Sequence, residues 1–207
     1  PAGWPTEGAP RHSPSSEPRR RWRRAASMRL TLELIENRPQ FINPLKEREL
    51  DLRGQRIPVM ENLSATRDQF DCIDLSNNDL RRLESATDLR RLKMLLLSNN
   101  KVSRVAAGAG ARFPNLEWLI LSNNAFTELS ELDPLAAFKS LRCLSLVDNA
   151  VAKQPHYRAY VLSRVPWLKV LDYQKVKEQE VAQARAHYAQ LHAGADPDAL
   201  RVRNKRG

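Results

Sequence analysis

The sequence predicts an α/β fold in which short parallel strands stack into a solenoid with a cap at each end. Three observations predict it. One eleven-residue pattern, apolar-x-x-apolar-x-apolar-x-x-Asn-x-apolar, occurs four times in the 207 residues. The Asn residues of successive copies are 22, 24 and 25 residues apart, within the period of roughly 20 to 29 residues that one strand and its return segment need. The segments before and after the copies lack the pattern, as capping segments do.

The four copies span residues 70–80, 92–102, 116–126 and 141–151, and their pattern is that of leucine-rich repeats. Side chains alternate between the two faces of a strand, so two apolar residues of each copy should point into the solenoid. These residues are Ile73 and Leu75, Leu95 and Leu97, Leu119 and Leu121, and Leu144 and Leu146. The Asn residues that follow the strands are expected to bond to backbone groups of the adjoining turns, which is a structural role and not a catalytic one. They are Asn78, Asn100, Asn124 and Asn149.

Residues 28–173 are expected to form this repeat domain with its caps. Thr31 is suited to cap a short helix that ends before Pro39 and covers the open N-terminal end of the solenoid. Residues 49–57 form a degenerate first repeat with Gln55 in the place of the Asn, which brings the number of repeats to about five.

The return segments between strands are expected to be mixed loops and short helices. Leu83, Leu89, Val105 and Phe113 should be their inward anchors. Gly108 and Gly110 make residues 103–115 a poor helix. Residues 133–140 look helical, with Asp133 as cap and Pro134 at the first helical position.

The C-terminal cap is expected to begin with a helix that Pro155 opens and Pro166 ends, followed by a closing strand at residues 168–171. Residues 174–193 should form a further helix that ends near Gly194. Its apolar stripe comprises Val181, Ala184, Tyr188 and Leu191.

The two ends of the chain are expected to be disordered. Residues 1–27 combine five Pro with six Arg and two Glu, and residues 194–207 form a basic tail. Residues 1–27 are open to three interpretations: a flexible leader or an over-extended start before Met28, a basic patch for nuclear import or RNA binding, or an organellar transit peptide. The formal net charge of +10 favours nucleic acid or another polyanion as a partner.

Several classes of function have no support in the sequence. Cys72 and Cys143 occupy equivalent positions of repeats separated by two others, so their thiols should lie roughly 15 Å apart, unpaired and reduced. The four His show no metal-ligand spacing with either Cys, and the sequence contains no phosphate loop or catalytic triad. The sequence contains no run of 18 apolar residues, the length that a membrane-spanning helix needs. We therefore expect no enzyme activity, cofactor, metal or small-molecule ligand.

The outward-facing strand residues carry the functional information. Met94, Leu96, Trp118 and Ile120 form a contiguous apolar patch, the composition of a protein interface. A concave trough of this kind fits an amphipathic partner helix, unless the chain's own terminal helix or a loop covers it. Asp51 and Asp74 at one border favour basic residues on that helix, and Arg53, Lys175 and Lys177, near the two ends of the solenoid, are candidates for phosphate contacts.

Segments outside the repeats carry a specific resemblance. RELDLRG (48–54), IPVMENL (57–63), ATRDQFD (65–71) and HYRAYVLSRVPWLKVLDYQKVK (156–177) resemble the A-prime family of the U2 small nuclear ribonucleoprotein, from Met28 to about Lys177. The resemblance implies a nuclear splicing subunit whose concave face grips a helix of the RNA-recognition-motif protein B-double-prime. It also implies that the pair binds a U2 small nuclear RNA stem-loop, with Arg53 and Lys177 at the family's RNA-facing positions.

The C-terminal cap leaves an alternative open. The segment HYRAYVLSRVPWLKVLD (156–172) also resembles the caps of phosphatase-regulator and dynein-associated repeat proteins. Those adaptors bind other protein surfaces and not an RNA-binding module, so the partner that co-purifies with the chain distinguishes the two hypotheses.

Overall fold

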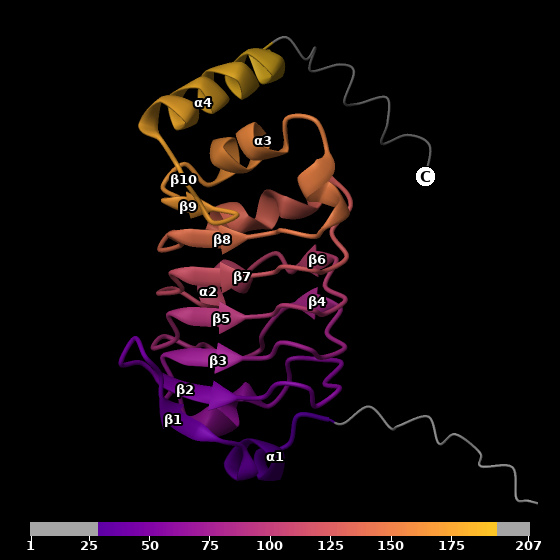
Figure 1. Ribbon diagram of the computed structural model, residues 1–207, viewed down its shortest axis with the longest axis vertical. Helices are drawn as coiled ribbons and strands as arrows, with labels where there is room; N and C mark the ends of the chain where they lie inside the picture. The colour runs from indigo at the N-terminus through magenta and orange to yellow at the C-terminus, as the bar shows by residue number, and fades with distance from the viewer. Residues whose placement is uncertain (1–28, 194–207) are drawn as a thin grey trace, which may run out of the picture.

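The molecule is an elongated stack of strands with helices at both ends (Figure 1). The computed structural model describes residues 29–193, so the expected leader (1–27) and tail (194–207) lie outside the described residues. The main sheet has eight strands in the order β1-β2-β3-β5-β7-β8-β9-β10. Their bounds are β1 Gln40–Ile42, β2 Arg48–Asp51, β3 Cys72–Asp74, β5 Met94–Leu96, β7 Trp118–Ile120, β8 Cys143–Ser145, β9 Val170–Leu171 and β10 Gln174–Lys175.

The strands from β2 to β9 are parallel, and β1 and β10 add to the two ends as antiparallel strands. The repeat pattern predicts the parallel strands but not the two antiparallel ones, because these are only two or three residues long and lie outside the repeats. An open sheet edge is a site for unwanted strand pairing. Each end of the solenoid is therefore closed by a hairpin in addition to a helix.

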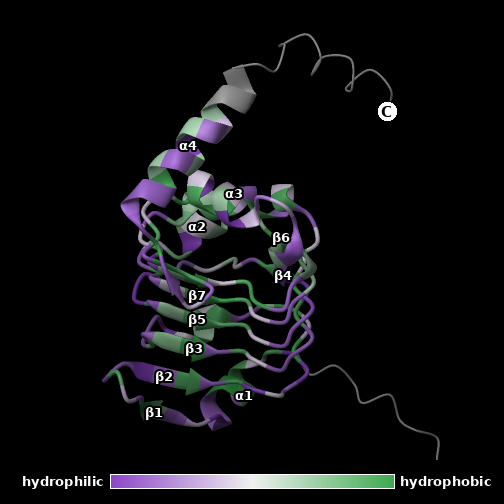
Figure 2. Cartoon of the chain, turned by 45° about the horizontal axis from the view of Figure 1, so that its top comes forward, coloured by the Kyte–Doolittle hydropathy of each residue, from purple (hydrophilic) through white to green (hydrophobic). Residues whose placement is uncertain are grey.

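The core runs through the middle of the stack. All eight strand residues predicted to point inward are at most 1% exposed, and Figure 2 shows apolar segments lining the interior. The four predicted anchors of the return segments, Leu83, Leu89, Val105 and Phe113, are buried as well. Phe113 stacks on Phe138 with ring centroids 6.4 Å apart. The inward periodicity read from the sequence is thus confirmed.

The return side contains more regular structure than expected. β4 (Arg82–Leu83) and β6 (Arg104–Val105) form a second, two-stranded parallel sheet. A 3-10 helix, η1 (Leu63–Thr66), precedes β3. Residues 103–115 are expected to be a poor helix, and their helical part is the single short turn α2 (Ala109–Arg112). A Cβ added at Gly110 would lie 2.5 Å from the Ala137 backbone, so this glycine allows two return segments to pack closely.

The helix predicted at 133–140 is placed differently. It is a 3-10 helix, η2 (Leu129–Ala137), which begins at Leu129, and Pro134 lies inside it. Asp133 is therefore not its cap. Glu128 occupies that position in a capping box, in which the Glu131 carboxylate accepts from the backbone N–H groups of Thr127 (2.8 Å) and Glu128 (3.0 Å).

The helical caps follow the prediction closely. α1 (Leu32–Asn37) begins behind Thr31, whose hydroxyl accepts from the Leu34 N–H at 3.2 Å. The turn η3 (Ala150–Lys153) leads into α3 (Tyr157–Arg164), and α4 (Glu178–Ala193) starts a few residues later than expected because Gln174 and Lys175 belong to β10.

α4 rests on α3. Ala184 is buried, Val181 and Tyr188 are half-buried against the core, and the Tyr188 ring meets Tyr160 edge-on at 5.4 Å. The side chain of Leu191, the last residue of the predicted stripe, lies outside the described part. No helix among residues 29–193 is long and apolar enough to span a membrane.

Candidate functional site

The repeated Asn residues hold the strands in register. Each side-chain amide donates to a carbonyl of its own repeat and to one of the preceding repeat; for Asn100 these are Leu97 (3.1 Å) and Leu75 (2.9 Å). Its Oδ1 atom accepts from the Leu80 N–H at 3.1 Å. Asn78, Asn124 and Asn149 bond in the same way. The outward strand faces are therefore fixed by a ladder of side chains that each link two repeats.

The residue before each ladder Asn has a different role. Asn77, Asn99, Asn123 and Asp148 have left-handed backbones, with φ of 59°, 57°, 51° and 60°. Asn and Asp tolerate this conformation better than other non-glycine residues. In each of the four repeats, a residue in the left-handed turn is thus followed directly by the Asn that makes the hydrogen bonds.

The outward strand residues align in rows across the sheet. The first row joins Glu49, Cys72, Met94, Trp118 and Cys143, and the second joins Asp51, Asp74, Leu96, Ile120 and Ser145. The two rows bring Met94, Leu96, Trp118 and Ile120 side by side, as the sequence predicts. Phe41 of β1 pairs with Glu49, extends the first row by one position, and is 41% exposed. Sequence reasoning missed it because β1 lies outside the repeats.

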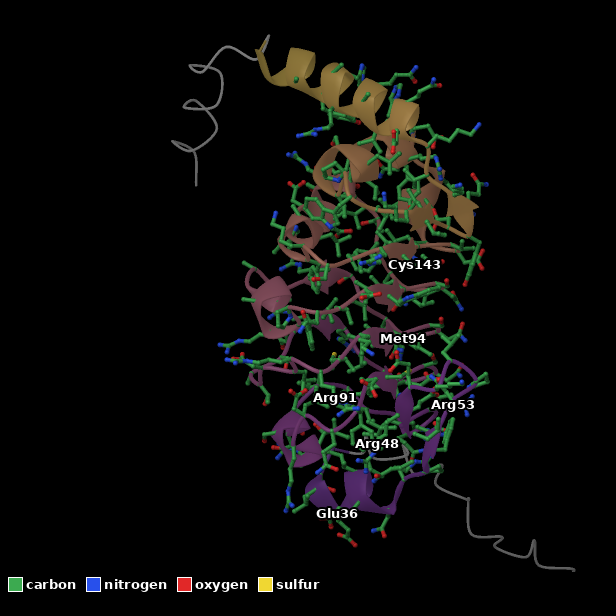
Figure 3. The ribbon with its side chains drawn as sticks, turned by 90° about the vertical axis from the view of Figure 1, so that its left-hand side faces the viewer. Glu36, Arg48, Arg53, Arg91, Met94 and Cys143 are labelled. Carbon is green, nitrogen blue, oxygen red and sulfur yellow. The ribbon has the colours of Figure 1, made fainter. Side chains whose placement is uncertain are left out.

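We call Met94, Leu96, Trp118 and Ile120 the apolar patch. Trp118 is 40% exposed and the other three are half-buried, so the patch faces solvent at the middle of the sheet. Met94 is seen at mid-height of the stack in Figure 3, below Cys143 and above Arg48 and Arg53. α4 packs against α3 and does not cover the patch, so the alternative in which the terminal helix folds back over it is excluded for the described residues.

The carboxylates of Asp51 and Asp74, at one border of the patch, form ion pairs with Arg53 of the same chain. Arg53 Nη2 lies 2.7 Å from Asp51 Oδ2, and its Nε lies 3.6 Å from Asp74 Oδ2. The hydrogen bond from Arg53 holds the pKa of Asp51 below its usual value despite the opposing effect of burial. Asp51 and Asp74 are both buried. They therefore present less negative charge to a partner than their sequence positions suggest, and the charge of Arg53 is largely engaged.

The opposite border is a line of charges where the strands begin. Asp71, which precedes β3, accepts from Arg91 at 3.1 Å, and Lys93, which precedes β5, bonds to Glu47 at 2.9 Å. Glu47 belongs to the turn between β1 and β2, so this turn is fastened across two repeats. The sequence gives no sign of this contact, which joins residues 46 positions apart.

The basic candidates lie at the two ends of the sheet. Arg53 follows β2, whereas Lys175 lies in β10 and Lys177 just beyond it. Both Lys side chains are exposed, and neither has a carboxylate within 4.0 Å among the described residues. Their charges are thus available to an anionic partner.

The Cys, His and acidic side chains of residues 29–193 form neither a metal-ligand cluster nor a disulfide. They contain no group of three or more His, Cys, Asp or Glu that could hold a metal ion. Burial raises the pKa of the Cys72 thiol, an effect reinforced by the carboxylate of Glu49, and Cys72 and Cys143 are unpaired. A buried thiol of raised pKa is a poor nucleophile.

Comparisons with known proteins agree with this geometry. A family model described as leucine-rich repeat matches residues 27–196. The chain is 52% identical over 157 residues to the human U2 small nuclear ribonucleoprotein A′, covering 76% of this chain and 62% of that protein. It is 46% identical over 166 residues to the Arabidopsis thaliana protein of the same name, covering 80% and 67%.

Among solved structures, the chain is similar to one described as the Drosophila melanogaster SNF/U2A′ complex. The TM-score is 0.76 at 44% identity, and the match covers 86% of this chain and 99% of that chain. The chain spans about three fifths of the length of the human relative, so the similarity concerns the repeat domain and its caps.

Proposed function

Because the chain belongs to the U2 small nuclear ribonucleoprotein A′ family of leucine-rich-repeat proteins, we propose that it is a non-enzymatic subunit of that ribonucleoprotein. In this role it acts in the nucleus and supports pre-mRNA splicing. Its work is to hold a second protein in the orientation that binds RNA.

The apolar patch is the observation that carries the proposal. Four neighbouring outward positions on β5 and β7 are apolar, and one of them, Trp118, is 40% exposed. Exposed clusters of this composition are typical of protein interfaces, in which a few aromatic anchors supply most of the binding energy. The solved relative is itself described as a complex with a second protein, which supports the same use of the fold.

The occupant of the patch is a helix of the RNA-recognition-motif protein B-double-prime. An α-helix with its side chains is about 10 to 12 Å across, so it covers two to three strands at their spacing of about 4.8 Å. Arg53 pairs with both Asp51 and Asp74 and offsets part of their negative charge, so the helix needs an apolar stripe more than a basic one.

The pair then binds a stem-loop of U2 small nuclear RNA, mostly through the partner. Lys175 and Lys177 add phosphate contacts at the C-terminal end of the sheet, and Arg53 adds a weaker one because it already binds two carboxylates. Phosphate contacts orient a complex without reading the base sequence. The chain thereby sharpens its partner's choice among similar hairpins.

A pull-down with the full chain tests the proposal. Tagged protein is incubated with nuclear extract, and the bound proteins and RNA are identified by mass spectrometry and sequencing. We expect an RNA-recognition-motif protein together with U2 RNA. Recovery of a phosphatase catalytic subunit or of dynein components, without U2 RNA, would refute the proposal and support the adaptor alternative.

A further inference from the structure

A polar cleft lies at the C-terminal end of the solenoid and takes no part in the contacts proposed above. It has a volume of about 400 Å³ and lies at the edge where β7, β8 and β9 begin. Its charged lining consists of Lys139, Arg142 and Lys169 with one carboxylate, Glu117, among the described residues. The cleft therefore carries a net charge of about +2 in a recess.

Two of these cations are held in place by the fold. Lys139 Nζ lies 4.5 Å from the centre of the Trp167 ring and donates to the Ala136 carbonyl at 2.7 Å. The Trp167 indole N–H donates to the Phe138 carbonyl at 2.9 Å, so the ring itself is fixed. Arg142 Nε lies 3.6 Å from Glu117 Oε2.

Lys169 differs from these two cations. It is exposed, and no carboxylate lies within 4.0 Å of it among residues 29–193. Within residues 29–193 no ion pair engages its charge, so Lys169 supplies an available cation to the cleft.

The cleft is continuous with the proposed RNA-contacting end of the sheet. The Lys169 N–H donates to the Arg142 carbonyl at 2.8 Å, and the Val176 N–H donates to the Lys169 carbonyl at 2.9 Å. Lys177 directly follows Val176. Arg142, Lys169 and Lys177 thus lie on successive chain segments, about 4.8 Å apart in the direction across the sheet.

We propose that this cleft is a second phosphate-binding site, which receives the sugar–phosphate backbone of the same RNA after it passes Lys177. The inference rests on the proposed RNA-binding function. An acidic protein segment fits the cleft less well, because the large apolar side chains that line it offer no free anchor: Leu141 is buried, and half-buried Trp167 has Lys139 Nζ 4.5 Å from the centre of its ring. Protein interfaces depend on such anchors, whereas phosphate contacts need only cations and polar groups.

Salt titrations of RNA binding test this site. The double variant Arg142→Gln/Lys169→Gln is prepared in the full chain, assembled with its RNA-recognition-motif partner, and titrated with the U2 stem-loop between 50 and 200 mM salt. The logarithm of the binding constant falls linearly with the logarithm of the salt concentration, and each lost phosphate contact makes this negative slope shallower by about 0.7 to 0.9. For the double variant we expect a slope that is shallower by about 1.5, and binding about tenfold weaker than that of the wild type at 200 mM salt.

The matched control removes two charges elsewhere. Arg82 and Arg104 are neighbours in register on β4 and β6, both are exposed, and within the described chain neither has a carboxylate within 4.0 Å. They belong to the separate sheet at the right of Figure 1. Arg82→Gln/Arg104→Gln should leave the slope unchanged.

The possible outcomes separate the two proposals. A slope that stays at the wild-type value in the cleft variant, while Lys177→Ala lowers it, overturns the cleft site and leaves the proposed function in place. An equal fall in the control variant overturns it too, because the effect is then one of net charge. Loss of the protein–protein complex in the cleft variant assigns the cleft to the partner protein. Absence of RNA binding by the wild-type pair refutes the proposed function itself.

Discussion

Truncation of Trp118 measures what the apolar patch contributes. A tryptophan can bury up to about 250 Å², and Trp118 is 40% exposed, which leaves roughly 100 Å² for a partner. At about 25 cal/mol per Å², Trp118→Ala should cost about 2.5 kcal/mol of binding energy, or about 60-fold in Kd. Trp118→Asp should abolish the complex, because it places an unpaired charge in the apolar trough.

Isothermal titration against the RNA-recognition-motif partner, with thermal melts followed by circular dichroism, checks this prediction. The melts should remain cooperative, with a midpoint somewhat below that of the wild type, because the part of the Trp118 side chain that is not exposed packs within the chain. Ile42→Asp is the matched control: Ile42 is an exposed apolar residue of β1 that pairs with Arg48 and lies on the opposite face from Phe41. Undiminished binding by Trp118→Asp would remove the concave face from the proposed mechanism.

Three further predictions concern stability and RNA contacts. Asn100→Ala leaves the buried Leu80 N–H without its acceptor, whereas the Leu75 and Leu97 carbonyls keep the amides of Asn78 and Asn124 as donors, so chemical denaturation should show a loss of about 1 to 3 kcal/mol. Asn99→Gly, at the exposed left-handed position, should cost less than about 1 kcal/mol. Lys177→Ala should lower the salt slope of RNA binding by about one counterion at most; an unchanged slope would make it a solvated cap residue. Arg53→Gln should raise the pKa of Asp51 towards the unfolded value of about 3.9. Because the pKa of Asp51 is lower in the folded than in the unfolded state, its ionisation stabilises the wild type above the unfolded pKa, and this stability is lost as the pH falls. The variant should therefore be less stable than the wild type at pH 7 and should lose less stability on acidification to pH 3. Equal pH profiles of the two proteins would contradict this.

The repeat pattern predicts most of the fold because it repeats one physical requirement. Every repeat must bury two apolar residues and form the same turn. This requirement predicts the inward residues, the bonding role of the Asn residues and the four neighbouring apolar positions on β5 and β7. The caps were also accessible, since Thr31 and the prolines around α3 act through local backbone geometry. The wrong start of η2 has a local cause as well: the Glu128 capping box competes with the Asp133-Pro134 signal and prevails.

The candidate site was less predictable because it depends on contacts between distant residues. The sequence identifies Asp51, Asp74 and Arg53 as charged outward residues, but only the folded chain shows that Arg53 pairs with both carboxylates. Phe41 joins the outward face through a three-residue antiparallel strand, which is too short for a periodic signal. The cleft at Lys139 likewise assembles from three segments whose spacing in the chain has no recognisable pattern.

Because each repeat adds one strand at a regular spacing, the number of repeats sets the distance between the two ends of the sheet. Six strand steps separate β2, next to Arg53, from β10, next to Lys177, and at about 4.8 Å each they set a span of roughly 29 Å along the sheet. Removing one repeat would shorten that span by about 5 Å while preserving every ladder bond of the remaining repeats. Under the proposed function, a gain or loss of whole repeats would therefore change the distance between the two phosphate contacts at Arg53 and Lys177, with no change in the residues that make them.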